Sequence, residues 1–88
     1  MAQDYPQPSL EIIISTFATQ AAVALGQVAS PVTHKTETDL EQAKFAIDLL
    51  QVLEEKSKGN RSDEEEALLS DLLYRLRMLY VDKSGGAA

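Results

Sequence analysis

The sequence contains no cysteine, no tryptophan and a single histidine among its 88 residues. Without thiols, the chain cannot form a disulfide or a thiolate metal site, and it lacks the nucleophile of cysteine enzymes. One imidazole, His34, is too few for most transition-metal sites, and its neighbour Lys35 indicates an exposed loop. Gly26 and Gly59 are isolated and form no phosphate-binding loop. We therefore predict that the protein is not an enzyme and binds no cofactor and no metal.

Basic residues are also scarce, with eight against fourteen acidic ones and a formal net charge of −6 at pH 7. Such a chain is repelled by nucleic-acid phosphates and by anionic membrane surfaces. The most apolar stretch, residues 10–25, is too short to span a bilayer and is interrupted by polar side chains such as Glu11. No secretory signal is visible near the N-terminus. We expect a cytoplasmic protein that binds neither nucleic acid nor membranes.

A chain of 88 residues forms at most one domain, and a domain of this size buries a limited core. Small domains are commonly stabilised by disulfides, by a metal or by oligomerisation. Because the composition disfavours the first two, oligomerisation is the means that we expect.

The distribution of turn-forming residues predicts one domain over residues 9–81. Residues 1–8 contain two prolines and indicate a flexible arm, whereas residues 82–88 are rich in glycine and alanine and indicate a disordered tail. The first helix of the domain is expected over about residues 10–25, with Ser9 as its N-cap. A connection over residues 26–38 follows, which is long for so small a protein.

Two further helices are expected after this connection. The second begins with a capping box that starts at Thr38 and continues to Glu41, and it ends near residue 56. The third begins with the box of Ser62 and Glu65 and runs to about residue 81. The short linker between them predicts a helical hairpin. The predicted fold class is therefore all-α, a three-helix protein of helix, long loop and helical hairpin, completed as a homo-oligomeric helical bundle.

Each predicted helix carries more apolar surface than the packing of three helices requires. A helix on one side of a core needs an apolar stripe somewhat over ~100° wide, but residues 40–56 present roughly twice that. The first helix adds a ridge of small side chains, which lets another backbone approach closely. A homodimer would cover these surplus faces, although singly exposed apolar residues are also common. The expected interface residues are Ile12, Ser15, Thr19, Ala22, Val23, Phe45, Leu49, Val52, Tyr74, Met78 and Val81.

Two charged groups have a functional and a simpler interpretation. The acidic run at residues 63–66 resembles a cation site, but carboxylates at a helix start already favour the helix dipole. Arg75 and Arg77 are suited to an acidic partner or a phosphate, although Asp71, four residues before Arg75, offers an ion pair. We favour the simpler interpretation for both groups.

A third polar group, Thr16, Thr19 and Gln20, lies within an otherwise apolar helix. It forms either a buried hydrogen-bonded cluster that fixes the register of an interface or a stripe that faces solvent. The sequence leaves these two alternatives open.

Short motifs in a fixed order make the sequence resemble a small bacterial family known only as domain of unknown function 1844. The resemblance covers roughly residues 10–81 and departs at His34, where we expect a glycine-like turn residue. It implies a free-standing bacterial cytoplasmic protein and brings no activity, cofactor or catalytic residue. The motifs are Ala18-Thr19-Gln20-Ala21, Leu25-Gly26, Pro31-Val32-Thr33, Asp39-Leu40, Ala43-Lys44, Ile47-Asp48-Leu49-Leu50, Leu53-Glu54-Glu55-Lys56, Lys58-Gly59-Asn60, Glu64-Glu65-Glu66, Leu72-Leu73-Tyr74, Leu76-Arg77 and Tyr80-Val81.

Two functional hypotheses follow from the surplus apolar surface. The first is a non-enzymatic, self-associating structural or adaptor module, most simply a dimer, with Phe45, Leu49 and Val52 as anchors. The second is a monomeric module that binds a helix of another protein in an apolar groove. Tyr74, Met78 and Val81 would line that groove, with Arg77 at its rim.

Overall fold

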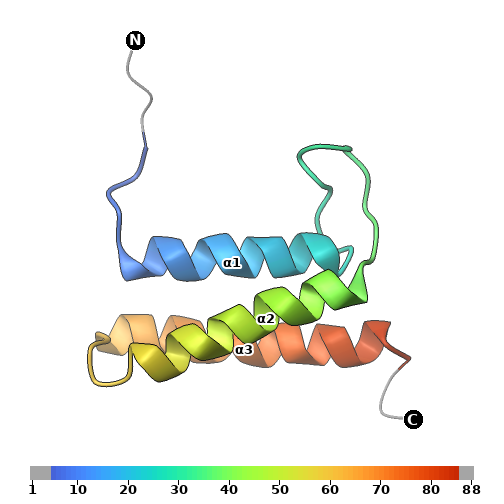
Figure 1. Ribbon diagram of the computed structural model, residues 1–88. Coiled ribbons are helices and arrows are strands. Elements are labelled where there is room, and N and C mark those ends of the chain that lie inside the picture. The colour runs from blue at the N-terminus through green and yellow to red at the C-terminus, as the bar shows by residue number, and fades with distance from the viewer. Residues whose placement is uncertain (1–4, 86–88) are drawn as a thin grey trace.

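Three helices account for most of the computed structural model, which describes residues 5–85 (Figure 1). They are α1 (Leu10–Ala24), α2 (Leu40–Lys56) and α3 (Asp63–Lys83), and no β-strand occurs within the described residues. The chain runs in the same direction along α1 and α3, and α2 returns obliquely across both (Figure 1). The Cα atoms extend only 16 Å in the thinnest direction. The predicted all-α, three-helix fold is therefore confirmed.

The helix starts follow from local capping. Ser9 Oγ accepts the Ile12 N–H at 3.2 Å, and Ser62 forms a complete capping box with Glu65. The predicted start of the second helix is wrong by one residue, because Asp39 is the N-cap and accepts the Gln42 N–H at 3.1 Å.

The end of α3 also differs from the prediction. It continues to Lys83, so two residues assigned to the tail are helical. Residues 5–9 precede the first helix without regular structure. The rest of the predicted arm and tail, residues 1–4 and 86–88, lies outside the described residues.

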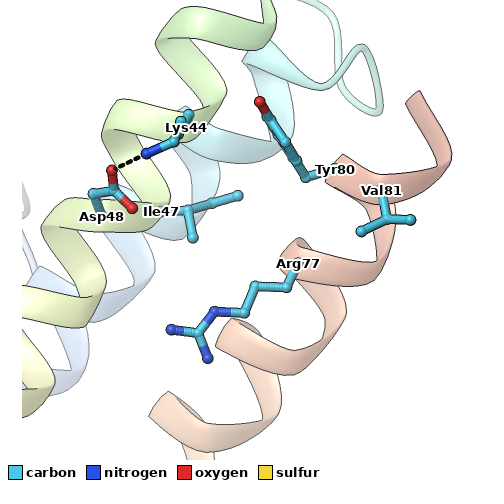
Figure 2. Close-up of a pocket in the computed structure, with 6 residues that line it drawn as sticks. All are labelled: Lys44, Ile47, Asp48, Arg77, Tyr80 and Val81. Atoms are coloured by element: carbon cyan, nitrogen blue, oxygen red, sulfur yellow. Dashed lines mark hydrogen bonds and ion pairs between the residues drawn. The ribbon is translucent and has the colours of Figure 1, made fainter. Parts of the chain in front are cut away.

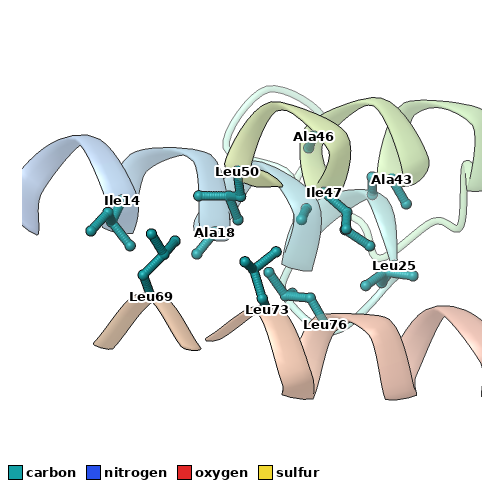
Figure 3. Close-up of a cluster of buried hydrophobic side chains, with 12 residues drawn as sticks. Ile14, Ala18, Leu25, Ala43, Ala46, Ile47, Leu50, Leu69, Leu73 and Leu76 are labelled. Carbon is teal, nitrogen blue, oxygen red and sulfur yellow. The ribbon is translucent and has the colours of Figure 1, made fainter. Parts of the chain in front are cut away.

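The buried core is small and rich in alanine (Figure 3). The most extensive contact between two helices joins α1 and α2, and leucines of α3 close the core from below. Partly buried side chains such as Phe17 and Leu53 pack around it. The twelve core residues are Ile14, Ala18, Ala21, Ala24, Leu25, Ala43, Ala46, Ile47, Leu50, Leu69, Leu73 and Leu76.

The long connection between α1 and α2 is closed at its base. Gly26 adopts a left-handed conformation, φ 76°, and the Gln27 N–H reaches back to the Ala22 carbonyl at 2.9 Å, as in a Schellman motif. Thr38 pairs with Leu25 in an isolated antiparallel bridge. This pairing places the loop ends side by side and lets the chain re-enter the bundle at α2.

His34 stands at the turn within this loop. With φ 61°, it is the one non-glycine residue of the described chain that has a left-handed backbone. The expectation of a glycine-like turn residue at this position therefore agrees with the backbone, and the histidine side chain is exposed there.

Arg61 joins α2 to α3 across their short linker. Its guanidinium group donates to the Glu54 carbonyl and to Ser57 Oγ, and it lies 3.4 Å from Glu66 Oε1. The Arg61 side chain is only 9% exposed. It satisfies a carbonyl near the end of α2 and thereby holds the hairpin turn.

Alanine at Gly26 should destabilise the protein more than alanine at Gly59. Both glycines have positive φ, which costs a side chain about 1 kcal/mol. A Cβ at Gly26 would also lie 2.8 Å from Thr38 Oγ1, whereas nothing lies within 4 Å at Gly59. Chemical denaturation should show a larger loss for Gly26→Ala than for Gly59→Ala, because the Thr38 side chain must move to admit the methyl group. Equal losses would show that the loop base is not tightly closed.

Arg61→Met should lower the free energy of unfolding by about 1–3 kcal/mol. Methionine keeps much of the aliphatic length but leaves the Glu54 carbonyl without its side-chain donor. Lys44→Met is the matched control, because the Lys44 side chain is 64% exposed, lies outside the contacts of Arg61, and its pair with Asp48 contributes little. Urea denaturation of the two variants compares them directly, and an equal loss would contradict the role given to Arg61.

Candidate apolar interaction surfaces

Large apolar side chains are more often exposed than buried in the described residues. Seven large aliphatic residues belong to the core, the other five core residues being alanines. Ten large hydrophobic residues are exposed, namely Tyr5, Ile12, Ile13, Val28, Val32, Phe45, Val52, Tyr74, Met78 and Val81. A monomer with so much apolar surface is unusual when the residues are contiguous. Their arrangement therefore decides whether they form interaction surfaces.

The first such surface is a groove between α1 and α3, here called the α1/α3 groove. The ridge of small side chains on α1 forms one wall, and leucines of α3 form the other. No residue of α2 contributes, so the groove lies on the side of the α1–α3 pair that α2 leaves uncovered. Its lining is Ser15, Ala18, Thr19, Ala22, Val28, Leu68, Leu72, Arg75, Leu76 and Leu79.

The second surface is a stripe on α2 that points away from the core, here called the α2 outer stripe. It consists of Phe45, Leu49 and Val52, which share one side of the helix by their spacing of four and three residues. Phe45 is 63% exposed and Val52 50% exposed, and Leu49 is half-buried. The buried residues of α2, such as Ala43 and Leu50, lie on the opposite side of the helix.

The residues predicted as one interface thus fall on several surfaces. Ser15, Thr19 and Ala22 line the α1/α3 groove, and Thr19 and Val23 border a hollow beneath the loop that includes Val32. Ile12 lies exposed on α1, away from the groove lining. The other predicted residues belong to the α2 outer stripe or to α3, where Tyr74 and Met78 are exposed on the outer side of the helix. A single flat interface does not cover them all.

A smaller pocket lies between α2 and α3 (Figure 2). Ile47, Tyr80 and Val81 supply its apolar surface, and Lys44 pairs with Asp48 at 2.8 Å along its edge. Arg77 also lines this pocket and donates to Gln51 Oε1 at 3.2 Å. Of the predicted second groove, only Val81 and Arg77 are therefore found here, without Tyr74 and Met78.

The charged side chains that line this pocket interact with neighbouring side chains of the protein. The hydrogen bond that Lys44 donates to Asp48, with the attraction between the two charges, raises the pKa of Lys44 above its ordinary 10.5. A raised pKa keeps the ammonium charged at neutral pH, and the pair is lost only as the pH rises through that raised value. Lys44 therefore offers no free base for chemistry near pH 7.

The other polar groups have structural explanations. The acidic side chains at residues 63–66 form the first turn of α3, and Arg75 Nε lies 3.2 Å from Asp71, as predicted. Thr16, Thr19 and Gln20 are exposed in the single chain, so they form no buried cluster within the three-helix fold. Between residues 5 and 85, no three His, Asp or Glu side chains are grouped to hold a metal ion. No helix in this part of the chain is long and apolar enough to cross a membrane.

These features define the class of the protein: an all-α, three-helix protein with an apolar groove between two of its helices. The family follows from the sequence match. Residues 7–82 match the model of the family described as Domain of unknown function (DUF1844), and the chain belongs to this family. No curated protein and no solved structure matches the chain.

The sequence alone did not indicate the α3 side of the α1/α3 groove. Leu68, Leu72 and Leu79 share the apolar face of α3 with the core leucines of that helix, and the sequence pattern does not separate the two groups. They are only partly buried, because α1 and α3 touch each other over less of their length than α1 and α2 do. Helical periodicity gives the width of an apolar face but not the part that a neighbour covers.

Proposed function

We propose that this protein is a non-enzymatic interaction module that pairs with a second copy of itself through the α1/α3 groove. The observation that carries the proposal is the groove itself, which exposes leucines of α3 beside a ridge of small residues on α1. The small core provides a physical reason, because oligomerisation stabilises small domains that bury little apolar surface.

A second copy suits this groove because a two-fold interface must be complementary to itself. Ser15, Thr19 and Ala22 lie four and three residues apart, so they form one small-residue ridge along α1. Two such ridges can cross with their backbones close together. The neighbouring Leu72 and Leu79 of each copy would then cover α1 of the other. The α1–α3 pairs of the two copies would face each other, and each α2 would lie on the outside of the dimer.

The charge of the groove also favours this pairing. The chain carries −6, so two copies repel each other at long range. None of the residues that line the groove is acidic, and its single charged residue, Arg75, is paired with Asp71 on its own helix. Contact through the α1/α3 groove therefore buries no carboxylate of the residues that line it.

We further propose a structural or adaptor role in the cytoplasm. A chain without cysteine is suited to a reducing compartment, where disulfides do not contribute to stability. The acidic surface supports protein partners rather than nucleic acid or anionic lipid.

Thr19→Glu should convert the dimer to a monomer. Light scattering after size-exclusion chromatography, across a dilution series, should give twice the 9.6 kDa chain mass for the unaltered protein. A carboxylate in the interface should raise the dissociation constant at least ~100-fold, because two charges would be buried in a groove whose one cationic residue, Arg75, is already paired with Asp71. Thr19 is exposed in the single chain, so the variant should keep its helical circular dichroism.

Ala67→Glu is the matched control, since Ala67 is exposed on α3 and does not line the groove. It adds the same charge but should remain a dimer. A monomeric unaltered protein, or equal weakening by both variants, would contradict the proposal.

A further inference from the structure

The α2 outer stripe has the residue spacing of a short coiled-coil seam. Gln42, Phe45, Leu49, Val52 and Lys56 alternate at intervals of three and four residues along one side of α2. This is the spacing at which one helix packs into the side of another. The centre of the seam is apolar and exposed, with Phe45 at 63% and Val52 at 50%, and its two ends are polar. The seam spans about 21 Å, since each helical residue rises 1.5 Å.

An acidic row accompanies this seam on one edge. Glu41, Asp48 and Glu55 follow each other at intervals of seven residues, so they lie in one line beside Phe45 and Val52. All three are exposed. Lys44 pairs with Asp48 at 2.8 Å, whereas the salt bridges of the described chain include neither Glu41 nor Glu55. The row therefore presents net negative charge to any helix that packs on the stripe.

This edge disfavours a second copy of α2 as the occupant. In an antiparallel pair of α2 helices, the two acidic rows would face each other and repel. In a parallel pair, each acidic row would face the opposite edge of the seam, which holds buried Ala46 and half-buried Leu53. Neither arrangement pairs the carboxylates with a cation. The acidic edge of the α2 outer stripe thus favours a partner other than a second copy of α2.

We propose that the α2 outer stripe binds a basic amphipathic helix of another protein. The partner helix supplies about two heptads, with aliphatic residues against Phe45, Leu49 and Val52. Lysine or arginine residues along one of its edges face the row of Glu41, Asp48 and Glu55. The proposal is independent of the dimer, because no residue of α2 lines the α1/α3 groove and the stripe remains exposed whether or not that groove is occupied.

Two synthetic helical peptides of equal length test whether the α2 outer stripe prefers a basic helix. Both carry leucine at the seam positions; one has lysine at the flanking positions and the other has glutamate. Isothermal titration calorimetry against the full chain should show the lysine peptide binding at least ~10-fold more tightly in dilute salt. Raising the salt concentration should reduce that difference, because exposed charges are screened.

Variants of the chain separate the apolar stripe from the acidic row. Glu41→Lys with Glu55→Lys should reverse the preference, so that the glutamate peptide binds more tightly. Phe45→Ser should weaken both peptides about 10-fold or more, because it removes an exposed ring from the centre of the seam. Tyr74→Ser, which removes an equally exposed ring from α3, should change neither affinity by more than ~2-fold.

The charge-reversed double variant also keeps the test falsifiable if Phe45→Ser folds poorly, since both substituted residues are exposed. The proposal is overturned if the two peptides bind equally, if neither binds, or if the double variant keeps the original preference. It is also overturned if Phe45→Ser halves the mass of the unaltered dimer, because the stripe would then join two copies of this chain.

Discussion

The packing of α1 against α2, which both bury alanines, is the contact on which the rest of the fold depends. Ala21 and Ala24 on α1 and Ala43 and Ala46 on α2 are all buried, and these two helices make the most extensive contact in the bundle. A methyl side chain keeps two backbones closer than leucine would, since helix separation depends on the side chains at the contact. The leucines of α3 then close the core from one side.

The same close contact explains why so much apolar surface remains outside. An alanine-lined contact buries little area per residue, so most large side chains of α1 and α2 find no room within it. On α2 they form the outer stripe, whereas the large apolar side chains that line the α1/α3 groove are mainly leucines of α3. The two surfaces differ in charge, because the groove lining contains no acid and the stripe is bordered by three. We propose that this difference assigns the groove to a second copy and the stripe to a basic partner.

Local signals allowed most of the fold to be predicted from the sequence. Ser9 and the Ser62 box start α1 and α3 as expected, because a capping residue acts on the backbone two or three positions away. The predicted start of α2 was wrong because Thr38 and Asp39 are both good N-cap residues. Thr38 forms the antiparallel bridge with Leu25, and Asp39 is the N-cap. The groove could not be predicted, since it depends on how far α3 lies from α1 and not on any local pattern.

Disulfide cross-linking of a Thr19→Cys chain tests the proposed pairing most directly. The protein contains no cysteine of its own, so a single introduced thiol can pair only with its copy in another molecule. Two cysteines join only when their Cα atoms approach within about 7 Å. Crossed α1 ridges centred on Thr19 should give rapid, nearly complete formation of a covalent dimer under mild oxidation, whereas Ala67→Cys should cross-link slowly. Equal, slow cross-linking of the two variants would contradict the account.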